Sequence, residues 1–132
     1  MDIRQVLLFH AQRVGRPFRL ALGHCQQGRL LMPKGYVIFT EDIRDEAGMN
    51  VYAQQAIPTI TQAGGRVIVA DDAPELIKGS WHGKRTVVLV FDSVEAARNW
   101  YRSPEYQGIA GLRHAAADSN AVIVAGFEMP TG

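Results

Sequence analysis

The stretch Arg85-Thr-Val-Val-Leu-Val-Phe-Asp-Ser-Val-Glu-Ala-Ala-Arg-Asn-Trp-Tyr-Arg-Ser-Pro-Glu-Tyr106 decides the fold of this chain. Residues 86–91 are all apolar or β-branched, and successive side chains of a strand point to opposite faces, so this strand is apolar on both faces. We therefore expect it to be central in a sheet. Two helix starts follow it directly. Asp92 or Ser93 can cap the first helix, and Ser103 precedes a proline at the first position of the second.

Similar patterns continue on both sides of this stretch. Further strands are predicted over residues 36–40, 66–70, 75–78 and 121–125. The segment 75–78 is expected to be only a short edge strand between two turns. Apolar residues at spacings of three and four predict a helix between Glu46 and Gly64. Pro58 lies inside that helix and removes one backbone hydrogen bond, so a kink or a break is expected there.

The order of these elements predicts an α+β fold, a ferredoxin-like βαββαβ subunit with a four-stranded antiparallel sheet and helices on one face. The strands are nevertheless apolar on both faces, since Val37 and Phe39 alternate with Ile38, and Val88 and Val90 alternate with Val87 and Leu89. A chain of this size has no spare element to cover them. We therefore expect a homodimer that forms through the open sheet face.

The net charge of the chain changes sign near Met32. Residues 1–31 have five arginines and one aspartate, a net charge of +4, whereas residues 32–132 have nine basic and twelve acidic residues, a net charge of −3. The second part, 32–132, is predicted to be a single domain. Three interpretations of 1–31 are open: a basic amphipathic extension, an arginine-rich leader, or a translated upstream region before a natural start at Met32. We favour the last.

Composition argues against several classes of function. The single cysteine, Cys25, cannot form an intramolecular disulfide, and no Cys/His cluster has metal-ligand spacing, so we expect a cytoplasmic protein without metal. Gly64-Gly65 precedes a strand, unlike a phosphate-binding loop, and no cofactor is expected. No apolar run approaches the roughly 20 residues of a membrane span. The acidic balance of 32–132 also argues against a nucleic-acid partner.

Several segments together carry a family resemblance: Lys34-Gly-Tyr-Val-Ile, Gly64-Gly-Arg-Val-Ile-Val, Arg85-Thr-Val-Val-Leu-Val-Phe, Ser93-Val-Glu-Ala-Ala-Arg, Trp100-Tyr, Ser103-Pro-Glu-Tyr-Gln, Leu112-Arg113 and Val122-Ile-Val-Ala-Gly126. From residue 32 to about 127 the chain resembles the bacterial family called domain of unknown function 1330. The resemblance implies a dimeric α/β barrel of ferredoxin-like subunits, in a superfamily that includes small monooxygenases, lactone isomerases and haem-handling enzymes. It implies no established activity.

This chain departs from the family pattern at a few positions. Charged residues are common in the family where this chain has Ala70, Val90 and Ala125, and a proline is common in place of Asp92. If the family uses those charges in a cavity, this member has a more apolar pocket or lacks that chemistry.

Four residues are candidates for a site, and each has a structural alternative. Tyr106 and Arg113 are seven residues apart, two helical turns, so they share a face and could bind a carboxylate or enolate. Tyr106 could equally be a core residue. Arg85, beside Trp81, could bind a ligand at the mouth of a cleft or form an ion pair that closes a turn. His82 could be a catalytic base or an exposed turn residue.

Two classes of function are consistent with these residues. One is a cofactor-independent enzyme acting on a small aromatic or enolisable metabolite in a pocket between sheet and helices. The other is a non-catalytic homodimer that binds a ligand or is purely structural. A buried cleft with convergent polar atoms around Tyr106, Arg113 or His82 favours the enzyme, and a closed apolar core favours the alternative.

Overall fold

The computed structural model describes residues 32–130. Its elements are β1 (Gly35–Ile43), α3 (Glu46–Gln62), β2 (Arg66–Asp71), β3 (Arg85–Phe91), α4 (Val94–Arg102), α5 (Pro104–Ala116) and β4 (Ala117–Ala125). The strands form one antiparallel sheet in the order β2-β3-β1-β4. The predicted ferredoxin-like arrangement is therefore confirmed, with β3 in the interior of the sheet and its second crossover divided between α4 and α5.

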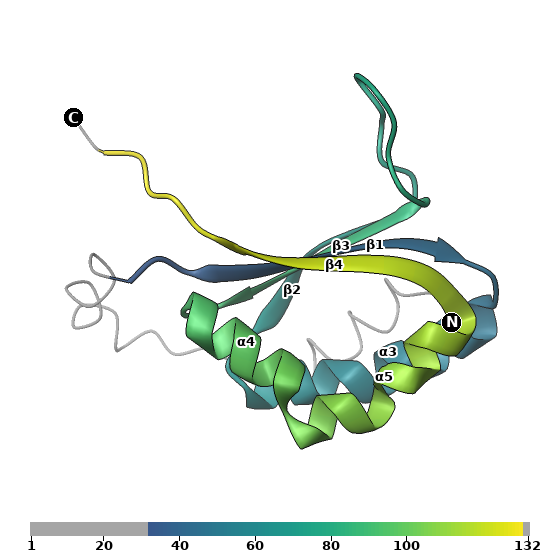
Figure 1. Ribbon diagram of the computed structural model, residues 1–132, viewed down its shortest axis with the longest axis horizontal. Helices are drawn as coiled ribbons and strands as arrows, with labels where there is room; N and C mark the ends of the chain where they lie inside the picture. The colour runs from purple at the N-terminus through teal and green to yellow at the C-terminus, as the bar shows by residue number, and fades with distance from the viewer. Residues whose placement is uncertain (1–31, 131–132) are drawn as a thin grey trace.

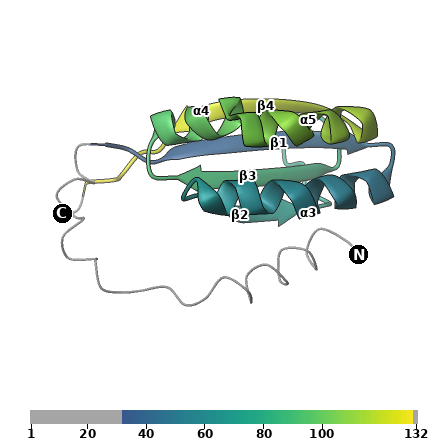
Figure 2. The ribbon, with the colours of Figure 1, turned by 90° about the horizontal axis from the view of Figure 1, so that it is seen from below.

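All three helices lie on one face of the sheet, as Figure 1 shows. Figure 2 shows α3 beside β2 and β3, and α4 and α5 beside β1 and β4. The core fills the layer between sheet and helices. It contains Phe39 and Leu89 from the strands and Met49, Trp100 and Tyr106 from the helices. This layer also holds the polar residues described below.

Serine caps divide the second crossover as the sequence predicts. Ser93 Oγ accepts a hydrogen bond from the backbone N–H of Ala96 at 3.0 Å and so caps α4. Ser103 ends α4 and also caps α5, where its Oγ accepts from the N–H of Tyr106 at 3.2 Å. The break between the two helices brings the aromatic residues at the end of α4 next to Tyr106 at the start of α5.

Helix α3 continues through Pro58, so of the kink or break predicted at this proline the break is absent. Tertiary packing on both sides of the proline explains why the helix continues, because Ala56 before it and Ile60 after it are buried against the core. Thr59 adds a local link. Its hydroxyl donates to the carbonyl of Ala56 at 2.7 Å and accepts from the indole N–H of Trp100 at 2.9 Å.

The predicted edge strand at residues 75–78 is wrong. These residues belong to an irregular segment, 72–84, which we call the arm and which rises from the sheet on the side opposite the helices (Figure 1). Pro74 has no backbone donor for strand pairing, and Gly79 turns the chain at φ +80°. The tip is exposed, with Ile77 89% accessible.

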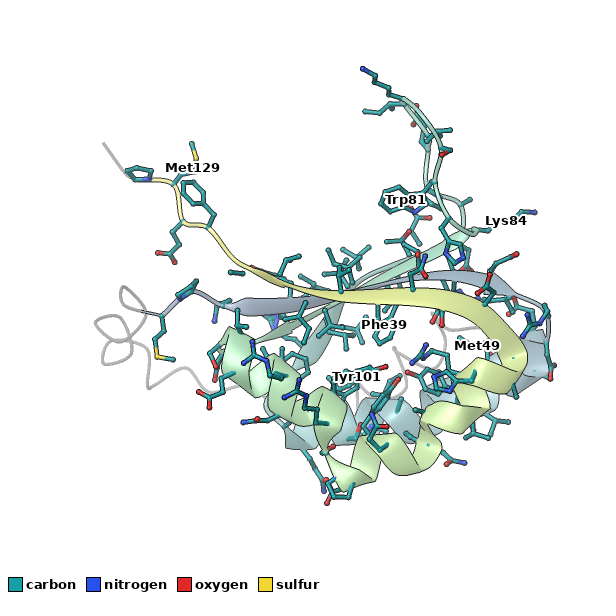
Figure 3. The ribbon with its side chains drawn as sticks, in the orientation of Figure 1. Phe39, Met49, Trp81, Lys84, Tyr101 and Met129 are labelled. Carbon is teal, nitrogen blue, oxygen red and sulfur yellow. The ribbon has the colours of Figure 1, made fainter. Side chains whose placement is uncertain are left out.

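The sheet face away from the helices is open and largely apolar, as expected from the strand sequences. Val122 is 52% exposed on this face, and Ile38 and Val88 beside it are half-buried. Exposed apolar side chains also stand at both ends of the face. Figure 3 shows Trp81 on the arm and Met129 in the C-terminal segment, both on the side away from the helices.

Candidate functional site

Arg113 and Tyr106 meet in the layer between sheet and helices, as their spacing on α5 predicts. The Nε of Arg113 donates to the Tyr106 hydroxyl at 3.2 Å. The other end of the guanidinium donates to Ser119 Oγ at 2.5 Å and to the Tyr101 hydroxyl at 3.4 Å, and its carbon lies 5.0 Å from the centre of the Phe39 ring. The guanidinium also lies 3.4 Å from His114 Nε2, so Arg113 is a buried cation among hydroxyl groups, an imidazole nitrogen and an aromatic face.

Within residues 32–130, no acidic side chain lies within ion-pair distance of Arg113. A buried cation without a direct carboxylate partner is costly, and a negative group nearby stabilises it. This pattern is typical of a position that meets a negative charge during function, although structural networks also produce it.

Tyr52, from α3, is a third tyrosine in this group, beside Tyr101 and Tyr106. Its hydroxyl lies 2.6 Å from that of Tyr106, and the two rings meet edge to face. Burial raises the pKa of both Tyr52 and Tyr106, so both phenols stay protonated at neutral pH. No sequence pattern singled out Tyr52, because it also fits the apolar face of its helix.

Glu41 is the residue that sequence reasoning missed. It lies on β1, is 3% exposed, and its Oε1 has no hydrogen-bond partner among the described residues. Burial raises the pKa of Glu41 to about 7, and the positive charges of Arg85 and Arg113 only partly oppose that rise. A carboxyl that titrates near neutral pH can accept or donate a proton under cellular conditions.

A small inner cavity lies between β1, β3 and α3. It measures about 40 Å³, and Glu41 and Tyr52 bring polar groups to a lining that is otherwise mostly apolar. Cavities of this size hold a water molecule or two, whereas ligand pockets measure roughly 300–1,000 Å³. The inner cavity alone is therefore too small for an organic molecule.

A larger cleft of about 320 Å³ lies at the end of the sheet near the base of the arm. Glu41 lines this outer cleft as well as the inner cavity, and Arg85 and Lys84 also line the cleft. Figure 3 shows Lys84 at the base of the arm. Glu41 is therefore the residue that lines both hollows.

Arg85 is nearly inaccessible, and two acidic residues bind it. Its Nη2 lies 3.3 Å from Glu46 at the start of α3, and its Nε lies 2.5 Å from Asp72 at the start of the arm. The ion pair considered as its structural role is therefore present. Arg85 is also the cross-strand neighbour of Glu41, so it forms part of the wall between the outer cleft and that carboxyl.

The structure places His82 away from this group. Its Nδ1 lies 2.9 Å from Thr40 Oγ1 and its Nε2 lies 3.5 Å from Asp118. Thr40 alternates with Glu41 along β1 and so points to the opposite face of the sheet. His82 does not line the inner cavity or the outer cleft.

Across the described part of the chain, no three or more His, Cys, Asp or Glu residues gather in a way that could hold a metal ion. None of its helices combines the length and hydrophobicity needed to cross a bilayer.

The fold and the buried polar residues define the class of protein. It is a ferredoxin-like α+β domain with a buried, ionisable carboxyl group between its sheet and its helices. The chain belongs to the family "domain of unknown function (DUF1330)", whose model matches residues 34–127. The predicted family membership is thus confirmed. Among curated proteins, no significant match is found.

Solved structures share the fold at low sequence identity. A protein of unknown function from Rhodopseudomonas palustris is 17% identical, with a TM-score of 0.63, and the match covers 84% of this chain and 97% of that one. SnoaB from Streptomyces nogalater, a cofactor-independent oxygenase, is 10% identical, with a TM-score of 0.55, and the match covers 74% of this chain and 96% of SnoaB. At these identities the likeness establishes the fold alone.

Proposed function

We propose that this protein binds a small organic molecule at Glu41 and acts on it as a cofactor-independent enzyme. The observation that carries the proposal is the buried carboxyl of Glu41, which has an unpaired oxygen and belongs to a residue that lines both hollows. Buried acids without partners are rare in cores, and a pKa near neutrality suits a general base. SnoaB supports the proposal to the extent that a similar fold serves cofactor-independent chemistry there.

The charges of the buried residues favour proton transfer from the ligand to Glu41. When ionised Glu41 takes a proton from a neutral ligand, the negative charge moves from the carboxylate to the ligand. Arg113 and Tyr106 then lie in the same buried layer as the new anion. Electrostatic stabilisation of a charge that develops during reaction is often the largest contribution to catalysis. We assign Glu41 the role of base, and we propose that Arg113 and Tyr106 stabilise the new anion without touching the ligand.

Size indicates how a ligand would lie. The outer cleft has the volume of a small ligand pocket, and the inner cavity, lined by Tyr52, lies on the other side of the shared residue Glu41. A ligand would therefore rest in the cleft against Arg85 and reach inward with its reactive end. Because the inner lining is mostly apolar, an aromatic or aliphatic carbon frame fits it better than a polar one.

A thermal-shift screen of small aromatic and enolisable compounds tests this proposal, with the wild-type protein compared with Glu41→Gln. Compounds that bind at the site should raise the melting temperature of the wild type and have a weaker effect on the variant. Glu75→Gln, which changes an exposed glutamate on the arm, is the matched control and should respond like the wild type. Identical responses in all three proteins would refute the assignment of the site to Glu41.

The open sheet face supports a second proposal, a homodimer in the manner of a dimeric α/β barrel. Exposed apolar groups extend from the arm across the sheet to the C-terminal segment: Leu76, Ile77, Trp81, Val122, Val124, Phe127 and Met129. A second copy offers the same surface, so it would cover these groups with matching ones. The non-catalytic alternative, a purely structural or ligand-binding dimer, explains this face equally well but not the buried carboxyl.

A further inference from the structure

The hydroxyl groups of Tyr52 and Tyr106 have a preferred hydrogen-bond direction that can be worked out from their neighbours. Arg113 can only donate, so the bond from its Nε uses an acceptor position on the Tyr106 oxygen. The hydrogen of Tyr106 then needs an acceptor of its own. Tyr106 is 0% exposed and does not line the inner cavity, and among the described residues the acceptor within reach is Tyr52, at 2.6 Å.

Tyr106 therefore donates to Tyr52, because the opposite direction would leave its buried hydrogen without a partner. Tyr52 in turn has its own hydrogen left to donate, and Tyr52 does line the cavity. The chain Arg113, Tyr106, Tyr52 thus runs from a buried cation to a hydroxyl donor at the cavity. Hydrogen bonds in such chains polarise one another, which strengthens the final donor.

We propose that Tyr52 donates a hydrogen bond to the ligand oxygen opposite Glu41, and that the site therefore takes neutral carbonyl compounds with an acidic neighbouring C–H, or the phenols that resemble their enols. This inference rests on the proposed function. Tyr52 touches the ligand, whereas Tyr106 and Arg113 are positioning residues that act through it. The residues that line the inner cavity then include one that can accept a proton, Glu41, and one that can donate a hydrogen bond, Tyr52, among mostly apolar side chains.

The reaction that follows is a proton transfer that balances within the site. The carboxylate of Glu41 takes the proton, so a Glu41 O–H bond forms as the C–H bond of the ligand breaks. The electron pair of that bond moves through the carbonyl group to its oxygen, which becomes an enolate oxygen and accepts the hydrogen bond from Tyr52. Return of the proton to another atom of the enolate completes an isomerisation, and no other reactant is consumed.

Two probes of similar shape test the inference: 4-nitrophenol, which can give its proton to Glu41, and 4-nitroanisole, which has no acidic proton. Binding is measured by titration against the wild type and three variants, and the absorbance of bound 4-nitrophenol reports whether it is ionised. We expect the phenol to bind more tightly than the anisole, as the phenolate. Tyr52→Phe should reduce phenol affinity roughly 10- to 100-fold, the usual range for a hydrogen bond to a charged group, and leave anisole affinity unchanged.

Two further variants separate a role in binding from a role in folding. Tyr106→Phe breaks the chain behind Tyr52 and should give a smaller loss in the same direction. Tyr101→Phe removes a hydroxyl that also contacts Arg113 but does not line the cavity, so it should leave the phenol preference intact. Melting curves recorded with each titration show whether a variant is folded.

Each remaining outcome contradicts part of the reasoning. If the wild type binds both probes equally, or if its phenol preference survives Tyr52→Phe, the inference is wrong while the binding site stands. A loss in Tyr101→Phe as large as in Tyr52→Phe would assign the effect to the surroundings of Arg113 instead. Failure of the wild type to bind either probe would overturn the proposed function together with the inference.

Discussion

Replacing Glu41 by glutamine should change how the stability of this protein depends on pH. In the folded protein the carboxyl faces Arg85 on β3, Arg113 on α5, Asp72 on the arm and Glu46 on α3, yet burial dominates and raises its pKa from 4.5 to about 7. In the unfolded chain it titrates near its ordinary value. Between these two pH values unfolding releases a proton, so the stability of the wild type falls as the pH rises and then levels off above about pH 7.

The size of the effect follows from the two pKa values. A rise from 4.5 to about 7, at 1.36 kcal/mol per unit, corresponds to about 3 kcal/mol of stability lost between acid and mildly alkaline pH. Glutamine at position 41 has a similar shape and does not titrate. As the pH rises from 4 to 8, the free energy of unfolding of the variant should therefore increase by about 3 kcal/mol relative to that of the wild type.

Urea denaturation at a series of pH values measures this difference directly. Glu75→Gln serves as the control, because it removes a carboxyl from the exposed arm and should run parallel to the wild type. If the curves of the wild type and of Glu41→Gln are parallel across the same range, Glu41 does not titrate near neutral pH. The general-base assignment would then fall.

Three further predictions concern other parts of the molecule. Arg113→Lys keeps the charge but loses the planar fork of donors, so affinity for phenols should fall by roughly tenfold or more; an effect on melting temperature alone would make the residue structural. A chain that begins at Met32 should melt within a few degrees of the full chain, since residues 34–127 match the family; a large loss would show that the preceding residues are integral. Light scattering at micromolar concentration should give the mass of a dimer for the wild type. A double variant with Val122→Asp on the open face and Ile77→Asp on the arm should be monomeric, with little change in the helical signal by circular dichroism. A monomeric wild type, or a double variant that stays dimeric, would refute the proposed interface.

The sequence predicted the sheet well because its strongest signals are local. Residues 86–91 form an unbroken apolar run, and Ser93 and Ser103 are good caps whichever way the chain folds around them. The expected break at Pro58 depends on tertiary packing, which a local rule does not include.

The candidate site was only half predictable, for a physical reason. Tyr106 and Arg113 share a helix face, which spacing alone establishes, whereas their neighbours come from other elements. Glu41 could have been noticed, since it follows Val37 and Phe39 in the alternation that marks the buried face of β1. Its importance depends on strand register, which places Arg85 across from it. The position of His82 depends on the path of the arm, which puts it beside Thr40 on the other side of the sheet.

The ion pair between Arg85 and Asp72 joins two regions that would otherwise be independent. Asp72 begins the arm, whose exposed apolar residues belong to the proposed dimer interface, and Arg85 lines the cleft together with Glu41. A partner that changes the position of the arm would therefore change the cleft, and a ligand in the cleft would change the arm. By thermodynamic reciprocity, a ligand that prefers the assembled form must tighten subunit association by the same factor. Apparent affinity for such a ligand would then depend on protein concentration, and dilution alone could release it.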